Sequence, residues 1–597
     1  MRDTYENYVG GVIRNERLRL EVNVNDVCDG ICSVPVYSKI ENGEYAGCIH
    51  VLRALCQRLG LNQNRCGMYF PKAEYDELMD RLYILEDIRD GRTDSAEERV
   101  SHYEKVYKDI PLNSQFILFM RGRLAELKED NAKALECYEN AIRLTIPEYE
   151  SRKNIVCMTI YEAYMILGAA RMRVKLGDEA AAYKLYMLLL RYCTCSKVEK
   201  WNLVCIYPKT VCELMKIIRK DKMSIREAEA MLEHCQNALG MLIETSRLHY
   251  IRPILQNIIQ FKILIKSNDD DNRDYRELSE AMENLFREYG HEHELFEWYP
   301  YYVDCGFYCV NELIAERRRM HGMSIEELAG DTQSARNVQR IVKGQVSPGY
   351  KTSKELLEKL GLKGVLRSDV VVGRNLEVYK LWDELQLCIK KQDFERADNI
   401  IEQLRCELDA SVEINDIALK YIRLYWDFCE NKITASDMME KLGKLLPFNI
   451  DEIGKYRILI KHEKVIIYDY IVCIDMLKKY DKIIDFDMLT LDMQDSLSKK
   501  RFASCFEEVS VRCANLYGNA GKFDTSNKIA EEGVRVDIEC ERMRPLSTLL
   551  YCIAWNNGKR GEVTEKDIDL CRCAYQIAKL NENEKRMGIY RKWLENR

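Results

Sequence analysis

The chain carries one pattern of about fifty residues twice, and this repeat limits what it can fold into. Residues 12–61 and 313–362 align without a gap at an offset of 301. Nine of the fifty pairs are identical, where average composition gives about three by chance. The identical pairs stand where a small helical unit needs core aliphatics, a cap or a turn glycine: Ile13/Ile314, Arg17/Arg318, Ser33/Ser334, Ile40/Ile341, Gly43/Gly344, Leu55/Leu356, Leu59/Leu360, Gly60/Gly361 and Leu61/Leu362.

Each copy opens with the spacing of two helices. Apolar residues at helical intervals predict a first helix over about 10–20 and again over about 310–321. A short second helix is expected over 25–31 in one copy and 324–329 in the other, where SIEE has the Ser-x-x-Glu form of a capping box.

A third helix follows a turn in both copies. Ser33 and Ser334 are placed to cap its N-terminus, and Pro35 lies in its first turn, where a missing N–H costs little. Gly43 and Gly344 end it, as glycines commonly do. A last helix closes on Leu-Gly-Leu, so each copy has the pattern of a helix-turn-helix unit.

These residues resemble the Cro/repressor-like helix-turn-helix of the XRE type. The first copy carries SKIENG (38–43) and closes on RLGL. In that family a helix-1 arginine pairs with the glutamate of the later turn, which implies an ion pair between Arg17 and Glu41. The second copy keeps Arg318 but has Val342 in place of the glutamate, so this pair is not expected there.

The resemblance implies that exposed side chains at the start of the third helix contact bases in the major groove of double-stranded DNA. Arginine suits guanine, and asparagine or glutamine suits adenine, through paired hydrogen bonds. A solvated helix face without function is the alternative. In the second copy the DNA-binding candidates are Ser334, Arg336, Asn337, Gln339, Arg340 and Lys343.

The first copy has a different face at the equivalent positions. Its candidates are Ser33, Val36, Ser38 and Lys39, beside Val34 and Pro35. Such a face can touch thymine methyls and phosphates, or it can serve as a protein–protein surface, and both interpretations stay open.

The two copies also differ in charge. Residues 310–363 contain ten Lys/Arg and seven Asp/Glu, a net charge of +3, whereas residues 8–61 contain six of each. The net charge of the whole chain is −7.

Tetratricopeptide-like helical pairs fill the rest of the chain. Gly122, Ala134, Tyr138 and Ala141 have the spacing of that repeat, with Pro147 near its close. Small residues let two helices approach, and the aromatic fills the joint. Weaker matches are Gly177, Ala182 and Tyr186, and then Gly521, Ser526, Ala530 and Gly533.

The duplication extends beyond the helix-turn-helix units, since 74–100 resembles 376–401 and 131–147 has the same relative place as 431–447. The aromatic-rich junction 290–306 is predicted to be a packed seam.

Because the chain has few prolines and glycines and helical spacing throughout, we predict an all-α fold in four domains. They are a helix-turn-helix unit over 1–66, a helical repeat domain over 67–304, a second helix-turn-helix unit over 305–365 and a second repeat domain over 366–597.

A helix-turn-helix joined to a tetratricopeptide array resembles the peptide-sensing transcription regulators, in which a signal peptide binds the repeats. The resemblance implies that asparagines hold the peptide backbone. It also suggests that one chain presents the two heads a homodimer normally supplies, although a homodimer stays possible. The candidate asparagines are Asn154, Asn202, Asn257, Asn515 and Asn519.

No pattern for catalysis, a cofactor or a metal is evident. The chain has no Gly-x-x-x-x-Gly-Lys-Ser/Thr loop and no His-Glu-x-x-His, and its 24 cysteines form no CxxC pairs. A metal or redox site in the first copy is the weaker alternative to core packing, because Cys28 aligns with the small Ala329. The cysteines concerned are Cys28, Cys32, Cys48, Cys56 and Cys66.

The N-terminus lacks the pattern of a signal peptide, and charges interrupt the most apolar stretch, 155–174. We therefore expect a cytoplasmic protein without a membrane partner. Two functions remain: a ligand- or peptide-responsive DNA-binding regulator, or a protein-interaction scaffold whose helix-turn-helix units no longer read DNA. The polar face of the second copy favours the first function, and the apolar face of the first copy favours the second.

Overall fold

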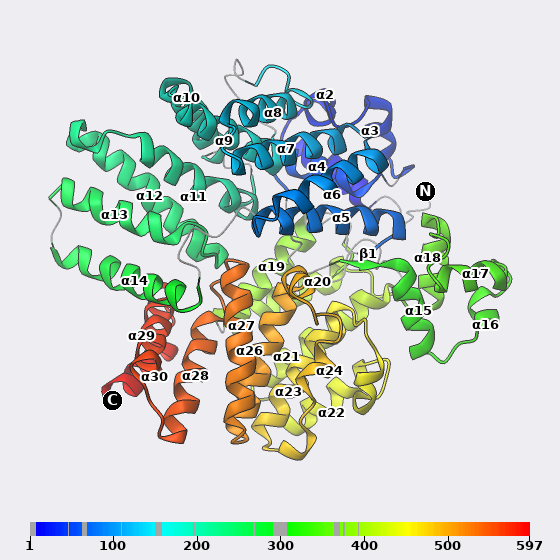
Figure 1. Cartoon of the computed structure of the whole chain (residues 1–597). Coiled ribbons are helices and arrows are strands. Elements are labelled where there is room, and N and C mark those ends of the chain that lie inside the picture. Colours follow the sequence, from blue (N-terminus) through cyan, green and yellow to red (C-terminus); the bar gives the residue numbers. More distant parts are fainter. Residues whose placement is uncertain are drawn as a thin grey trace.

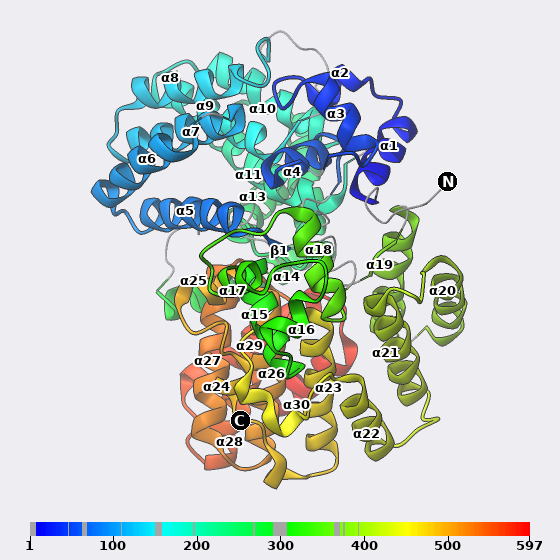
Figure 2. The same cartoon turned by 90° about the vertical axis from the view of Figure 1, so that its right-hand side faces the viewer.

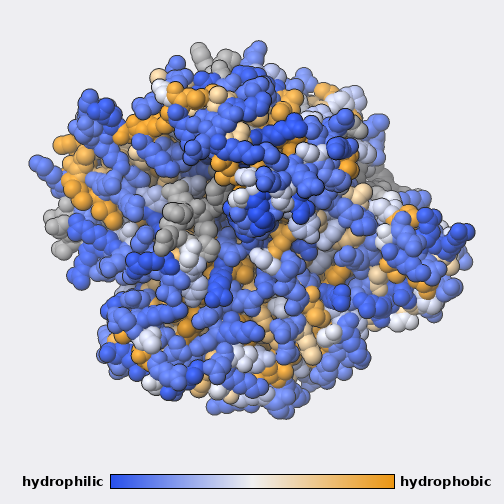
Figure 3. All heavy atoms as spheres, in the orientation of Figure 1, coloured by the Kyte–Doolittle hydropathy of each residue, from blue (hydrophilic) through white to orange (hydrophobic). Residues whose placement is uncertain are grey.

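A computed structural model describes residues 8–45, 47–61, 69–108, 110–149, 158–194, 198–266, 269–290, 307–362, 371–373, 376–391 and 393–597. The all-α prediction is confirmed: helices follow one another along the described chain, and the strands in it are two residues long (Figure 1). Among the helices described, none combines the length and apolar character that a membrane span requires. The face in Figure 3 is mainly hydrophilic, with apolar side chains in small patches.

Two small groups of helices, which we call the heads, correspond to the repeated pattern. The first head consists of α1 (Tyr8–Arg19), α2 (Val24–Cys28), α3 (Val34–Glu41) and α4 (Ile49–Arg58). The second head consists of α15 (Val310–Met320), α16 (Ile325–Ala329), α17 (Ala335–Val342) and α18 (Tyr350–Lys359). The bounds of α2, α3 and α4 recur at α16, α17 and α18 with the offset of 301, so equal spacing in sequence gives equal helices.

Side-chain caps mark the first residues of two helices of the second head, α16 and α17. The Ser324 and Glu327 capping box is present, and the Ser334 hydroxyl accepts from the backbone N–H of Asn337 at 3.2 Å. Ser33 occupies the N-cap position, but its side chain makes no cap hydrogen bond, so that part of the expectation is wrong. The expected second helix of the first head is also shorter, ending at Cys28 because the chain turns at Asp29 and Gly30.

The remaining helices form two arrays in which most helices pack on the next, as in helical repeat proteins; in the second array α23 packs on α26 across the short elements between them. The first repeat region comprises α5 (Lys72–Arg89), α6 (Thr93–Tyr107), α7 (Pro111–Leu127), α8 (Asn131–Arg143), α9 (Ile160–Lys175), α10 (Glu179–Cys193), α11 (Lys200–Ile217), α12 (Ile225–Thr245), α13 (Ile251–Leu264) and α14 (Asp269–Glu288). A short 3-10 helix, η3 (Lys220–Lys222), lies between α11 and α12.

The second repeat region begins with α19 (Leu376–Lys391), α20 (Phe394–Glu407), α21 (Glu413–Cys429), α22 (Ala435–Leu445) and η4 (Ile450–Lys455). It continues with α23 (Lys461–Met476), η5 (Tyr480–Lys482), α24 (Phe486–Leu489), α25 (Ser496–Arg501) and α26 (Ala503–Asn519). It ends with α27 (Phe523–Glu539), α28 (Leu546–Arg560), α29 (Glu565–Leu580) and α30 (Glu584–Glu595).

Tyr138 shows why the repeat pattern needs small residues. Its side chain is fully buried and its ring lies between two glycines, Gly122 of α7 and Gly168 of α9. A methyl group would come within 2.7 Å of a ring carbon at Gly122 and within 2.8 Å at Gly168. The tyrosine therefore occupies space that a larger neighbour would take, and three consecutive helices pack at close range.

Two pairs of helices in the repeat regions share the offset of 301. Helices α9 and α23 have bounds exactly 301 residues apart, and α6 and α20 begin 301 residues apart. The correspondence breaks at α10, where the second region has the short elements η5, α24 and α25 instead of one long helix. The replaced segment includes α25, which contacts α5 of the first repeat region.

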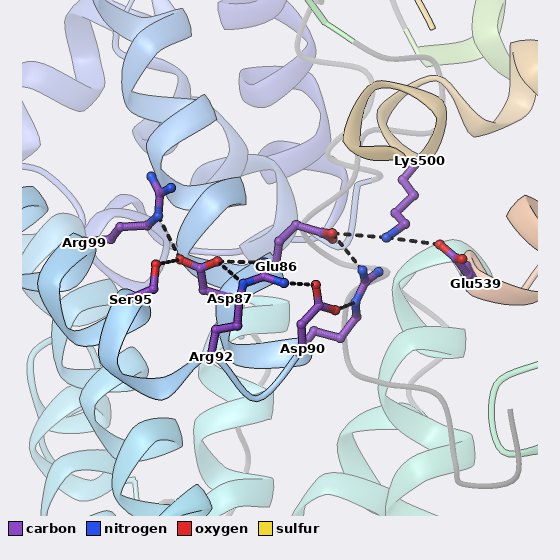
Figure 4. A network of polar contacts seen from close by, with 9 residues as sticks. Glu86, Asp87, Asp90, Arg92, Ser95, Arg99, Lys500 and Glu539 are labelled. Carbon is purple, nitrogen blue, oxygen red and sulfur yellow. Dashed lines mark hydrogen bonds and ion pairs between the residues drawn. The ribbon is translucent and has the colours of Figure 1, made fainter. Parts of the chain in front are cut away.

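Lys500 makes that contact between the two regions (Figure 4). It lies on α25 with its side chain almost fully buried, and its ammonium stands 3.1 Å from a carboxylate oxygen of Glu86 on α5 and 3.1 Å from one of Glu539 on α27. Asp87 and Asp90 continue the network on the α5 side with Arg92, Ser95 and Arg99. One buried cation thus bridges acidic groups from both halves of the chain.

Backbone pairing joins the halves at two further places. Strand β1 (Tyr69–Phe70), which follows the first head, pairs in parallel with β2 (Tyr308–Cys309), which precedes the second. The rings of Tyr69 and Tyr308 stack at 5.5 Å. Beyond them, Arg247 and Arg542 form an antiparallel bridge, and α14 packs against α29. Of the junction 290–306, predicted to be a packed seam, all but Gly290 lies outside the described residues.

Candidate nucleic-acid interface

Helix α17 exposes polar and basic side chains on one side and packs against the second head with the other. Val338 and Ile341 are fully buried beneath it and hold it to the second head. Ser334, Arg336, Gln339, Arg340 and Lys343 are exposed. Asn337 is half-buried, and its amide lies 3.4 Å from the side-chain oxygen of Gln333. The structure therefore brings five of the six predicted side chains of this copy to the surface of one short segment.

Helix α3 has the same position in the first head but a different surface. Tyr37 and Ile40 are buried beneath it. Ser33, Ser38 and Lys39 are exposed, Val36 is half-buried, and Val34 is 45 % exposed. This face offers methyl groups, hydroxyls and a single ammonium.

The ion pair implied for the first head is present. The Nε of Arg17 lies 2.8 Å from Glu41, and the Tyr37 hydroxyl donates to the same carboxylate at 2.8 Å. The hydrogen bond to Glu41 raises the pKa of Arg17 despite the opposing effect of burial. Arg17 also donates to the Val22 carbonyl at 3.4 Å, and Arg318 keeps the equivalent bond to the Met323 carbonyl at 2.5 Å, while Val342 in place of the glutamate cannot form the ion pair.

A buried ion pair anchors the first head to its repeat region. Arg58 of α4 lies 2.6 Å from Glu162 of α9, with both side chains almost fully buried. The same guanidinium donates to the carbonyls of Asp29 at 2.6 Å and Thr145 at 3.1 Å. Burial opposes ionisation of Glu162, but the Arg58 charge outweighs it and lowers the pKa of Glu162. The pair therefore stays charged and fixes the head.

The second head is anchored through the equivalent carboxylate. Glu463 stands 301 residues after Glu162, and each accepts from the backbone N–H three residues before it, at 2.6 Å from Thr159 and 2.9 Å from Ile460. The cation differs, because Glu463 pairs at 2.6 Å with Arg317 of α15 rather than with a residue of α18. The equivalent helices α9 and α23 thus each hold one head, but α9 binds α4 of the first head and α23 binds α15 of the second.

His50 adds a titratable group to the joint of the first head. It is fully buried on α4, with its Nε2 3.2 Å from a carboxylate oxygen of Glu77 on α5. Burial, and then the charge of Arg81, lower the pKa of His50 to about 4. Burial opposes ionisation of Glu77, but the close contact with His50 and the charge of Arg81 bring its pKa down to about 2. At neutral pH the joint therefore holds a neutral imidazole and an ionised carboxylate.

The candidate asparagines for a ligand are spread over several helices. Asn202 of α11 is buried and donates to the Leu61 carbonyl at 2.9 Å, so it helps to hold the first head. Asn257 of α13 accepts from Lys220, and Asn519 of α26 donates to Asp475, both at 2.8 Å. Asn515 is exposed on α26. Asn154 lies outside the described residues.

The cysteines of the first head behave as small apolar residues. Cys28 and Cys56 are buried, and Cys32 and Cys48 are half-buried; Cys66 lies outside the described residues. Burial raises the pKa of the Cys32 thiol to about 12, which keeps it protonated. Within the described residues, no three His, Cys, Asp or Glu side chains are grouped as metal ligands.

Sequence reasoning missed the anchoring carboxylates, although a signal existed. Glu162 and Glu463 are identical at the offset of 301, outside the fifty-residue repeat. Their partners carried no such signal, because Arg58 aligns with Lys359, and Arg317 aligns with Glu16.

Comparison with known proteins gives a distant structural likeness. No protein family model and no curated protein matches the chain. PlcR of Bacillus thuringiensis, solved with the peptide PapR7 and DNA, is 16 % identical over 48 % of this chain and 99 % of its own, at a TM-score of 0.32. ComR from S. thermophilus, solved with DNA and its signalling peptide, is 14 % identical over 48 % and 99 %, at 0.27. The Streptococcus dysgalactiae pheromone receptor Rgg2 is 14 % identical over the same shares, at 0.25.

Proposed function

We propose that this chain is a DNA-binding transcription regulator of the XRE type whose second head reads base sequence through α17. The observation that carries the proposal is the exposed trio Arg336, Gln339 and Arg340 on a capped helix with a packed underside. Arginine and glutamine are the side chains that make paired hydrogen bonds to guanine and adenine in the major groove. Arg336 lies in the first turn of α17, and Gln339 and Arg340 follow one turn later on its exposed side, which matches the way a recognition helix docks in the major groove.

The distribution of charge supports the same assignment. The chain as a whole carries −7, so its overall field repels nucleic acid. The segment 310–363 carries +3, and Arg336, Arg340 and Lys343 lie exposed on or directly after α17. Attraction to phosphates is therefore local to the second head, and binding should weaken as salt rises.

We further propose that the repeat regions receive a peptide or another ligand. The solved structures of PlcR and ComR contain both DNA and a peptide, which makes this pair of ligands a reasonable expectation here. Asn515, exposed on α26, is the candidate to test first. Asn154, Asn202, Asn257 and Asn519 remain candidates of lower priority, since the last three already hold partners within the chain.

The two heads act together in this proposal, as a pseudo-dimer built from a tandem duplication. The exact offset of α2, α3, α4 and α9 supports the duplication. The pairing of β1 with β2 and the buried bridge of Lys500 support one closed arrangement of the halves. A homodimer of this chain would carry four heads. We place the protein in the cytoplasm, where DNA and the proposed ligand meet.

A protein-interaction scaffold is the alternative function. It is favoured by the exposed apolar side chains on and beside α3, Val34 at 45 % and Tyr45 at 51 %. In that case α17 would be a solvated face, and neither head would bind duplex DNA.

Binding of the full chain to duplexes selected from a random pool, measured across a salt series, separates the two functions. We expect salt-dependent binding and a loss of about 1–3 kcal/mol on the selected duplex for Arg336→Ala or Arg340→Ala. Arg226→Ala is the matched control, because Arg226 is an exposed arginine of α12 far along the chain from either head. Failure of the wild type to bind any duplex would overturn the regulator proposal.

A further inference from the structure

The two helices proposed to face DNA share their buried side but differ at most of the positions that face away from it. Tyr37 and Ile40 under α3 correspond to Val338 and Ile341 under α17, all of them fully buried or nearly so. The cap serine is kept at Ser33/Ser334, and Lys39/Arg340 keeps a positive charge. The other pairs at the offset of 301 differ in chemistry: Val34/Ala335, Pro35/Arg336, Val36/Asn337, Ser38/Gln339 and Asn42/Lys343. The scaffold of the helix is kept while the chemistry it presents is replaced.

The difference predicts contact with different bases. Arginine and glutamine on α17 have donors and acceptors for the edges of guanine and adenine. Valine and proline on α3 have none, and the group they can contact favourably in the major groove is the methyl of thymine. On α3 itself a single cation, Lys39, faces solvent, and after the helix Glu44 takes the place of the neutral Gln345. Phosphate attraction is therefore weaker at the first head.

Each head is fixed to its own repeat region by a buried ion pair. Arg58–Glu162 fixes the first to α9, and Arg317–Glu463 fixes the second to α23. Figure 2, which looks at the right-hand side of Figure 1, shows both heads on that side of the molecule. The β1–β2 pairing ties the chain after the first head to the chain before the second. Two different faces are therefore presented in one fixed order.

We infer that the DNA site of this protein is asymmetric, with a purine-reading half for α17 and a thymine-rich half for α3. The inference rests on the proposed DNA-binding function and deepens it. Two identical heads related by a twofold axis require a palindromic site, because each half meets the same side chains. Here each half-site meets a different set. The second head supplies most of the attraction to phosphates, and the first head distinguishes thymine from other bases through its methyl group.

Selection of duplexes by the full chain, followed by sequencing, tests the asymmetry directly. The expected result is a site whose two halves differ and have a fixed order. Inverting one half within the selected duplex should reduce binding more than tenfold, because several base pairs are then mismatched at about 1–3 kcal/mol each. A palindromic site, or one constrained only in the half bound by α17, overturns the inference.

Replacement of thymine by deoxyuridine tests the chemistry of the first head without changing any hydrogen bond. Each methyl removed from the α3 half should weaken binding by about fourfold, the value of one buried methylene group. The Val34→Ala variant should lose part of this sensitivity, whereas Arg340→Ala should keep it and relax the purine half. Val34 is exposed, so its truncation leaves the core unchanged.

The outcomes separate this inference from the function it rests on. If the wild-type chain shows no salt-dependent binding to any duplex, the proposed function itself is wrong. Binding with equal affinity to thymine and deoxyuridine in the α3 half leaves the regulator in place but overturns the asymmetric site. That second outcome would assign the apolar face of α3 to a protein partner instead.

Discussion

Removing the charge of Glu162 gives the sharpest test of how the first head is held. The Glu162→Gln variant leaves the shape of the side chain but removes the partner of Arg58, which lies 2.6 Å away with 3 % of its side chain exposed. Removing one partner of a buried ion pair typically costs about 3–5 kcal/mol. Arg58 keeps the carbonyls of Asp29 and Thr145 as acceptors, and glutamine can still accept one hydrogen bond. We therefore expect a loss of about 2–3 kcal/mol.

Urea unfolding followed by helical circular dichroism measures this loss. With a slope of about 2–3 kcal/mol per molar, the midpoint should fall by about 0.7–1.5 M. Limited proteolysis should release the first head earlier in the variant. The matched control is Glu440→Gln, which removes an exposed pair with Lys444 on α22 and should change neither readout.

A double variant shows whether the unpaired cation is the cause. Replacing Arg58 by methionine in the Glu162→Gln background removes the buried charge, so part of the lost stability should return. A Glu162→Gln variant that unfolds like the wild type, or a double variant no more stable than the single one, would contradict this role of the buried pair.

Three further predictions concern other parts of the structure. Because the pKa of His50 lies near 4 in the fold and near 6.5 when unfolded, the unfolded chain takes the proton first. Stability should fall by up to about 3 kcal/mol as the pH drops from about 6.5 toward 4. In the His50→Gln variant the thermal unfolding temperature should therefore depend less on pH between pH 7 and pH 5. A pH dependence equal to that of the wild type would contradict this. Gly168→Ala places a methyl against the ring of Tyr138 and should cost about 1–3 kcal/mol in urea unfolding, whereas Gly443→Ala, in open space on α22, should stabilise by up to about 1 kcal/mol. Lys500→Met removes the cation that bridges Glu86 and Glu539, although Glu86 keeps Arg89 at 2.8 Å, and should cost about 1–3 kcal/mol; equal proteolysis of variant and wild type would argue against a role in joining the halves.

Local signals in the sequence were sufficient for the helices of the heads. Capping residues, a turn glycine and the 3.6-residue spacing act within a few residues, and they placed α3 and α17 correctly. The expected hydroxyl cap at Ser33 did not form, although Ser334 in the same place makes its bond. A cap position read from sequence specifies the backbone, while the rotation of a hydroxyl depends on its surroundings.

By itself, the sequence determined the all-helical class, the two related heads and the contrast between their exposed faces, because these depend on spacing and residue type along a short stretch. The tertiary structure decided the contacts across long separations: Arg58 with Glu162, 104 residues apart, and Lys500 with Glu86, 414 apart. Such pairs leave no periodic signal, since their partners meet only when whole helices pack. For the same reason the structure alone assigned Asn202 to the joint of the first head, a place that spacing along the chain could not give.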